Sequence, residues 1–174
     1  APLDGWSREM YFDDTSLPWI IPSPNLPTLD STIVYPGCVL FEGTNLSEGR
    51  GTTRPFELIG APWLPADELA RTLNSLSLPG VVFRSAHFEP TCQKHARQTC
   101  GGCQIHVTDR RVYRPVLTAV VLLQAARQAV PARFGWREPP YEYEHEKRPI
   151  DILSGSDRFR TEIEADVPAS EIAK

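Results

Sequence analysis

Residues 41–54, called here the acidic loop, hold the densest group of side chains suited to acid–base chemistry and polar binding in this sequence. Two carboxylates, Glu42 and Glu48, and two guanidiniums, Arg50 and Arg54, alternate with hydroxyl, amide and glycine residues. Polar groups cost roughly 2–7 kcal/mol each to bury unpaired, and each glycine weakens a helix or strand by about 0.5–1 kcal/mol. The composition favours a tight loop close to a polar ligand, and the alternative is a solvated connection.

The chemistry open to this loop is that of paired carboxylates. Glycoside hydrolysis needs one protonated carboxylic acid and a second, ionised group nearby, and Glu42 and Glu48 bracket the loop. A neighbouring guanidinium stabilises the ionised form of one carboxylate, whereas a drier setting favours the protonated form of the other. The sequence shows no P-loop, dinucleotide fingerprint, nucleophile elbow or Ser-His-Asp order.

Two further groups of side chains are candidates for binding. His106 lies inside an expected strand, where a histidine is more often a satisfied core residue than a catalyst, and Asp109 follows it. Residues 141–146 read YEYEHE, which as a strand would present one aromatic and one acidic face. We interpret this stretch as an edge ribbon over the core, and keep its tyrosines as candidates because sugar rings pack on aromatic faces.

The cysteines leave several alternatives open. Cys100 and Cys103 have the spacing of a metal or redox pair, but a structural zinc site needs two further ligands, for which His95 and His106 are the nearby candidates. A redox pair belongs at a strand-to-helix junction, whereas this pair precedes a strand. A disulfide among Cys92, Cys100 and Cys103 and a set of free thiols are the other two possibilities.

Length and charge narrow the class of protein. A chain of 174 residues can bury one sizeable core, and 41% hydrophobic with 23% charged residues is ordinary for a globular domain. The net charge of −4 argues against a nucleic-acid binder, which needs a basic face. No apolar run approaches the about 18 residues of a membrane span, so no transmembrane segment is expected.

Hydrophobic periodicity and helix signals predict two or three strands among several helices. The expected helices cover residues 29–41 with a kink at Pro36, 65–78, 116–129, 150–153, 156–164 capped by Ser156, and 169–172. The expected strands cover residues 80–84, with an extended continuation to residue 90, and 104–108. The seventeen prolines cluster in residues 18–36 and 131–149, interspersed with aromatic residues, which indicates long ordered loops. The fold class is therefore α/β or α+β, with a small mixed sheet and flanking helices.

Motifs spread along the whole chain resemble the C-terminal part of the NamZ-type exo-β-N-acetylmuramidases, a bacterial family. They are GWSREM at residues 5–10, LPW at 17–19, PSPN at 22–25, YPG at 35–37, EGTNLSEGRGT at 42–52, RPF at 54–56, GAPW at 60–63, LPGV at 78–81 and QIHVTD at 104–109. The stretch 42–52 is specific by itself, and the other motifs are specific in combination.

The resemblance implies a cell-wall enzyme that removes N-acetylmuramic acid from the non-reducing ends of peptidoglycan fragments, and it implies no metal ion or organic cofactor. Family members are typically exported, which implies a periplasmic or secreted location. They join an N-terminal Rossmann-like domain to a smaller C-terminal α/β domain, with the sugar in the cleft between them. We therefore expect residues 1–28 to be a junction segment, residues 29–174 to be the C-terminal domain, and the Rossmann-like catalytic domain to lie outside this chain.

The acidic loop suits such a substrate. N-acetylmuramic acid carries a lactyl carboxylate, hydroxyls and an acetamide, and arginine binds carboxylates in a bidentate manner, so Arg50 or Arg54 is expected to hold the lactyl group. Glu42 and Glu48 are the candidate catalytic residues, one donating a proton or orienting the donor. The remaining candidates for substrate binding are Thr44, Asn45, Ser47 and His106. The alternative function is a non-catalytic domain of the envelope that binds glycan or a partner.

Overall fold

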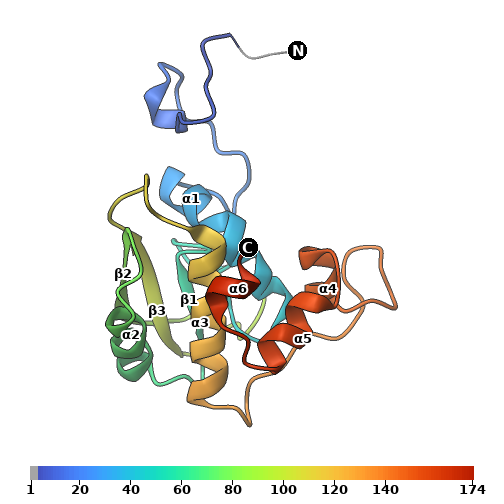
Figure 1. Ribbon diagram of the computed structural model, residues 1–174. Coiled ribbons are helices and arrows are strands. Elements are labelled where there is room, and N and C mark those ends of the chain that lie inside the picture. Colours follow the sequence, from blue (N-terminus) through green and yellow to red (C-terminus); the bar gives the residue numbers. More distant parts are fainter. Residues whose placement is uncertain (1–3) are drawn as a thin grey trace.

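The computed structural model describes residues 4–174, which form one layer of sheet and several packed helices (Figure 1). The sheet holds three strands in the order β1-β3-β2: β1 (Leu58–Ala61), β2 (Val81–Phe88) and β3 (Cys100–Val107). Both pairings are antiparallel, with Ile59 opposite Cys103 and Phe83 opposite Ile105. The fold is therefore α+β, and the sheet is antiparallel throughout where the sequence predicted a mixed one.

The strands extend beyond the sequence prediction. β3 begins at Cys100 instead of Gln104, because the two glycines that follow Cys100 pair with β1 and β2. β1 was not expected at all, since it is only four residues long, contains Gly60 and is followed by Pro62. All four of its residues are buried.

Two helices form the centre of the molecule. α1 (Leu29–Cys38) and α3 (Pro115–Ala129) pack against each other beside the sheet (Figure 1). The hydroxyl of Thr28 caps α1 by accepting the N–H of Ser31. A Cβ on Gly37 would lie 2.1 Å from the carbonyl oxygen of Pro115, so only glycine permits this approach of α1 to α3.

The predicted helix over residues 29–41 is divided in the structure, but the division falls after Pro36, which lies inside α1. α1 ends at Cys38 and the chain continues as a 3-10 turn, η2 (Val39–Gly43), which packs against α1, α3 and α4. This turn carries Glu42 into the acidic loop. The packing of three helices around η2 therefore fixes the position of the first candidate carboxylate.

The remaining helices follow the sequence prediction closely. α2 (Ala66–Ser75) buries Leu69 and Leu73 and packs on β2 and β3. Three short helices close the C-terminal end: α4 (Pro149–Ser154), α5 (Arg158–Glu164) and α6 (Ala169–Ile172). The sequence predicted Ser156 as the cap of α5, whereas the cap residue in the structure is Asp157. The Asp157 side chain makes no cap hydrogen bond.

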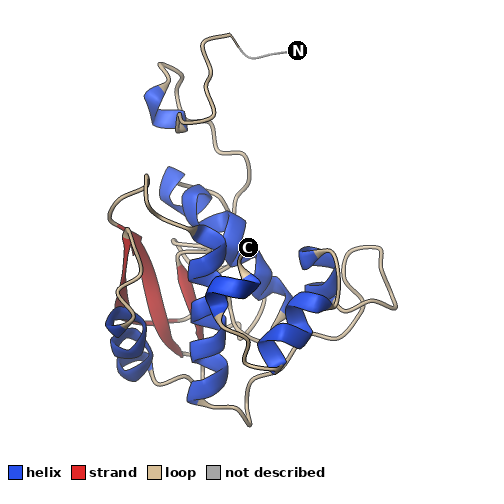
Figure 2. Cartoon of the chain, in the orientation of Figure 1, coloured by secondary structure: helices blue, strands red, loops and turns tan. Residues whose placement is uncertain are grey.

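Long irregular segments connect these elements (Figure 2). Residues 18–28 and 131–148 contain no regular helix or strand, but indole hydrogen bonds order both segments. Trp19 donates to the carbonyl of Pro27 within its own segment, and Trp136 donates to the carboxylate of Glu164 in α5. A short 3-10 turn, η1 (Phe12–Asp14), is the one helical turn described before α1. Residues 141–146 form a tight turn closed by a bridge between Tyr141 and Glu144, not the predicted edge ribbon.

Candidate functional site

The acidic loop is held in a fixed shape by the sheet and by its own polar groups. Ser47 forms a bridge with Gly60 of β1, and the N–H of Phe56 donates to the carbonyl of Glu48 at 2.6 Å. Thr44 and Ser47 are buried, and their hydroxyls accept the N–H groups of Leu46 and Gly49. In this structure both hydroxyls therefore stabilise turns of the loop.

Asn45 connects the loop to the proline-rich segment 131–148. Its side-chain amide donates to the carbonyl of Arg133 at 2.7 Å and accepts the N–H of Gly135 at 3.1 Å. Its backbone N–H donates to the Gly135 carbonyl at 2.9 Å. With both ends of its side chain engaged, Asn45 holds two walls of the candidate site together.

Glu48 is buried with two cations. Its Oε2 accepts a hydrogen bond from Nζ of Lys94 at 2.8 Å, and its Oε1 lies 3.3 Å from Nε of Arg50. The Lys94 ammonium also donates to the carbonyls of Phe41 at 2.7 Å and Leu46 at 2.9 Å. Burial lowers the pKa of Lys94, and the Glu48 carboxylate opposes that shift. The ammonium therefore holds both the loop backbone and one candidate catalytic carboxylate.

Glu42 lies on the other side of Arg50. Its Oε1 accepts from the Arg50 guanidinium at 2.5 Å, and its Oε2 accepts from the Tyr141 hydroxyl at 2.7 Å. Burial and this hydrogen bond raise the pKa of Tyr141, so the phenol remains a donor. Arg50 also lies over the ring of the buried Phe56, with 5.0 Å between the guanidinium carbon and the ring centroid. The two carboxylates predicted from sequence thus share one arginine.

Lys94 reaches the loop from a strained segment, residues 90–98, called here the clamp segment. Gln93, His95 and Arg97 all adopt left-handed backbone angles, with φ of 66°, 56° and 62°. Left-handed residues other than glycine are uncommon and persist where the surroundings enforce them. Hydrogen bonds to the acidic loop hold the clamp segment in this conformation. Nε2 of His95 lies 2.7 Å from the carbonyl oxygen of Asn45, and the N–H of Thr91 donates to the carbonyl of Gly51.

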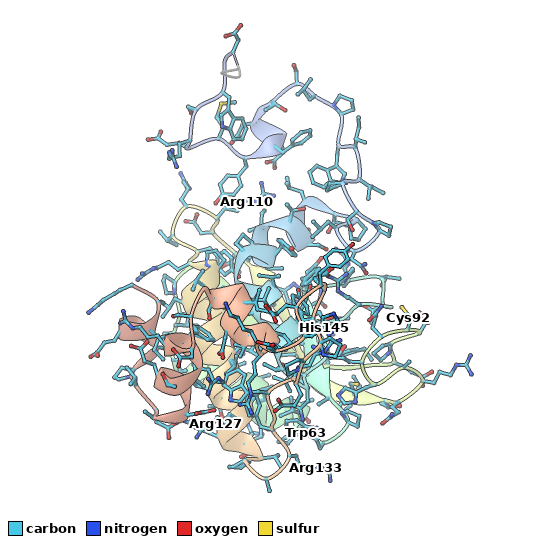
Figure 3. The ribbon with its side chains drawn as sticks, turned by 90° about the vertical axis from the view of Figure 1, so that its right-hand side faces the viewer. Trp63, Cys92, Arg110, Arg127, Arg133 and His145 are labelled. Carbon is cyan, nitrogen blue, oxygen red and sulfur yellow. The ribbon has the colours of Figure 1, made fainter. Side chains whose placement is uncertain are left out.

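The loop, the clamp segment and the turn at residues 141–146 surround a cavity of about 330 Å³, called here the loop pocket. Its lining is almost entirely polar: Glu42, Glu48, Arg50, Gln93, Lys94, Arg137, Tyr141 and Glu142. Figure 3 labels Cys92 of the clamp segment and His145 of the 141–146 turn. Three carboxylates and three cations in one cavity suit a ligand rich in polar groups.

Arg54 and His106 lie elsewhere, in a second cavity of about 180 Å³ between α1 and β3, called here the sheet cavity. Its other lining residues are Asp30, Val34, Glu57, Gln104, Ile105 and Val107. Arg54 approaches the buried Glu57 at 3.5 Å, and Nε2 of His106 is buried without a hydrogen-bond partner among the described residues. The structure therefore divides the predicted site residues between two cavities.

The cysteines are free thiols, which is one of the alternatives left open by the sequence. Cys100 and Cys103 both lie on β3, where residues three apart point to opposite faces and cannot form a disulfide. Burial raises the pKa of Cys100 to about 11 and that of Cys103 to about 12, so neither is a reactive thiolate. Across residues 4–174 no three His, Cys, Asp or Glu side chains are grouped to hold a metal ion. No helix in that range is both long and apolar enough to span a bilayer.

Sequence reasoning missed two cations of the loop pocket, Lys94 and Arg137. Lys94 belongs to a polar segment typical of a protein surface, and Arg137 lies in the proline-rich stretch. Long-range packing brings both cations to the loop. The unusual backbone of the clamp segment, with three left-handed residues, marks this region in the structure but cannot be recognised from the sequence. The sequence predicted that the ring of Tyr141 could pack against a sugar, whereas in the structure its hydroxyl donates a hydrogen bond to Glu42.

The fold and the loop pocket together define a small α+β domain with a pocket of paired carboxylates and cations. The chain matches the family described as exo-beta-N-acetylmuramidase NamZ, C-terminal, over residues 33–174. It belongs to this family. The resemblance found in the sequence motifs is thereby confirmed.

Relatives support the same assignment. The chain is 48% identical over 159 residues to the peptidoglycan beta-N-acetylmuramidase NamZ of Bacillus subtilis strain 168, covering 91% of this chain and 36% of the relative. A DUF1343 family protein from Bacteroides fragilis NCTC 9343 has a similar structure, with a TM-score of 0.80 and 29% identity over 95% of this chain and 42% of that protein.

A second DUF1343 family protein from Bacteroides fragilis shares the fold, with a TM-score of 0.57 and 24% identity over 88% of this chain and 38% of its own. The chain thus spans well under half the length of each of these relatives.

Proposed function

We propose that this chain forms one wall of the sugar site of an exo-β-N-acetylmuramidase, which hydrolyses non-reducing-end N-acetylmuramic acid from peptidoglycan fragments. The observation that carries the proposal is the loop pocket, where Glu42 and Glu48 flank Arg50 at the edge of a polar cavity. The 48% identity to a protein named as a peptidoglycan β-N-acetylmuramidase supports the same reaction. Neither the geometry nor the comparisons favour the non-catalytic alternative.

The contacts suggest how the two carboxylates act. Arg50 lies within ion-pair distance of both carboxylates, and Lys94 lies within hydrogen-bonding distance of Glu48. Ionised carboxylates stabilise the positive charge that develops on the sugar ring when the glycosidic bond breaks. In this proposal Glu42 and Glu48 supply that negative charge and orient the sugar, and the proton donor belongs to another domain of the enzyme.

The site is then shared between domains. The relatives are much longer than this chain, and in the proposal an N-terminal Rossmann-like domain supplies the opposite wall of the cleft. The predicted boundary, with a junction over residues 1–28 and the domain over 29–174, fits α1 beginning at Leu29. We also propose that the enzyme acts outside the cytoplasmic membrane, in cell-wall turnover, because its substrate lies there. Cell fractionation with an antibody against the domain checks the location.

The test of activity uses the full-length protein and a chromogenic N-acetylmuramide. Glu42→Gln is expected to lower kcat by about 10²-fold or more, because the neutral amide no longer stabilises charge in the transition state. Glu48→Gln is expected to do the same, but its burial makes a folding check by circular dichroism necessary. Glu68→Gln, on the exposed side of α2, is the matched control. Full activity in folded Glu42→Gln and Glu48→Gln proteins would contradict the catalytic role of the loop.

A further inference from the structure

The three cations of the loop pocket differ in how they are engaged. Arg50 is bound to Glu42 and Glu48, and Lys94 is bound to Glu48 and two carbonyls. Arg137 makes no ion pair and no side-chain hydrogen bond with any residue in the range 4–174, although it lines the same cavity. Its guanidinium carbon lies 5.9 Å from the ring centroid of Tyr141, which orients the group without satisfying its donors.

The backbone at Arg137 is anchored to the acidic loop. Its N–H donates to the carbonyl of Gly43 at 2.9 Å, and the preceding residue, Trp136, forms a bridge with Thr44. The residue is exposed and lines the cavity, so a ligand from solution can reach its donors. An arginine with a fixed base and free donors beside a pocket is suited to binding an anion from solution.

We propose that Arg137 is the residue that binds the carboxylate of an acidic sugar in the loop pocket. Arginine presents parallel N–H donors that match both oxygens of a carboxylate. This inference rests on the proposed function and names the group that gives specificity: the lactyl carboxylate of N-acetylmuramic acid. A neutral sugar such as N-acetylglucosamine lacks that group and leaves Arg137 without a partner.

The other charges in the pocket fit such a ligand. Glu142 has no ion pair within residues 4–174 and faces the same cavity, so it can accept hydrogen bonds from sugar hydroxyls or from the acetamide N–H. Arg137 also lies close enough to Lys94 to contribute to the lowered pKa of that ammonium. A bound carboxylate would offset this repulsion between two cations.

The proposal revises the prediction made from the sequence, which expected Arg50 or Arg54 to hold the lactyl group. Arg50 is committed to Glu42 and Glu48, and drawing it away would leave both carboxylates with fewer partners. Arg54 lines the sheet cavity and not the loop pocket. Of the two arginines that line the loop pocket, Arg137 is the one whose side-chain donors have no partner within residues 4–174.

The test compares two sugars that differ by the lactyl group, using titration calorimetry on the protein at its full encoded length. The wild-type protein is expected to bind N-acetylmuramic acid about ten- to a hundredfold more tightly than N-acetylglucosamine, the range for hydrogen bonds to a charged group. Arg137→Ala should remove this preference and leave binding of N-acetylglucosamine within about twofold. Arg137→Lys should keep part of the preference, because it retains the charge but not the bidentate geometry.

Arg133→Ala is the matched control, since Arg133, labelled in Figure 3, is an exposed arginine of the same segment. Its backbone carbonyl accepts the hydrogen bond from the Asn45 amide. This variant should keep the full preference. If Arg137→Ala keeps the preference as well, the proposal for Arg137 is wrong, whereas the proposed hydrolase remains supported by the Glu42→Gln assay. A wild-type protein that binds both sugars equally, or neither, also overturns the proposal, and the same assay then decides whether the proposed function survives.

Discussion

The two polar cavities are both built beside a buried glutamate, yet they surround it with different partners. Glu48 and Glu57 are each 3% exposed. Glu48 binds the ammonium of Lys94 and lies near Arg50, and it opens onto the loop pocket. Glu57 accepts hydrogen bonds from the hydroxyls of Ser31 and Thr28 and from the amide of Gln104, with Arg54 at 3.5 Å.

This difference separates a scaffold from a site. Thr28 and Ser31 form the first turn of α1, so Glu57 joins that turn to β3 through neutral donors and acts as part of the fold. Glu48 is instead held by cations that reach it from the loop and from the clamp segment, beside a cavity large enough for a polar ligand. The two buried carboxylates therefore differ in their closest partners, which are neutral donors for Glu57 and the Lys94 ammonium for Glu48.

Replacing Lys94 should give the largest effect on stability. Lys94→Met removes the ammonium that binds Glu48 and two loop carbonyls, and breaking a buried ion pair from one side costs about 3–5 kcal/mol. We expect the low end of this range because Arg50 remains beside Glu48. Urea denaturation measures the free energy of unfolding.

Lys147→Met is the control for that variant, because Lys147 is exposed and makes no ion pair within residues 4–174. It should change the free energy of unfolding by less than about 0.5 kcal/mol. An equal loss in the two variants would show that Lys94 is an ordinary surface lysine and that the contrast between Glu48 and Glu57 does not hold.

A smaller loss is expected in the sheet cavity. Glu57→Gln keeps one acceptor but places an amide donor against the donor groups around it, which costs about 1–3 kcal/mol. Because Glu57 lies outside the loop pocket, affinity for N-acetylmuramic acid should be unchanged in the folded variant. Glu89→Gln, at an exposed position after β2, is the control for stability. Weaker sugar binding by folded Glu57→Gln would mean that the two cavities act together.

The sequence was informative where local rules determine structure. Helices α2 and α3 were predicted from apolar spacing and proline boundaries, and they occur within a few residues of the expected ends. The closeness of Glu42 and Glu48 in the chain predicted that the two carboxylates lie near an arginine, whereas the structure shows that both share Arg50. These features depend on residues that are neighbours in sequence, which is the information that composition and spacing carry.

What could not be predicted depends on contacts between distant residues. Lys94 binds a carboxylate 46 positions earlier, and Tyr141 binds one 99 positions earlier. Arg54 is close to Arg50 in the sequence, yet the two arginines line different cavities. The chain enters β1 four residues after Arg54, and the Arg54 side chain lines the sheet cavity. Loop composition marked the region of the site, whereas only the packing of the clamp segment and the 141–146 turn shows which side chains face the pocket.

The smallest effect on stability should come from replacing Ser47. This variant tests whether Ser47 supports the loop structure or contacts the substrate. The sequence predicted that Ser47 contacts substrate, but its hydroxyl accepts the N–H of Gly49 at 3.1 Å and the residue is 2% exposed. Ser47→Ala should therefore cost about 1 kcal/mol of unfolding free energy through one lost hydrogen bond. Sugar affinity and kcat should stay within about twofold of the wild type. A tenfold loss of affinity in a variant with unchanged stability would instead mean that the loop opens to present Ser47 to the ligand, and the scaffold would then extend less far into the loop than its hydrogen bonds indicate.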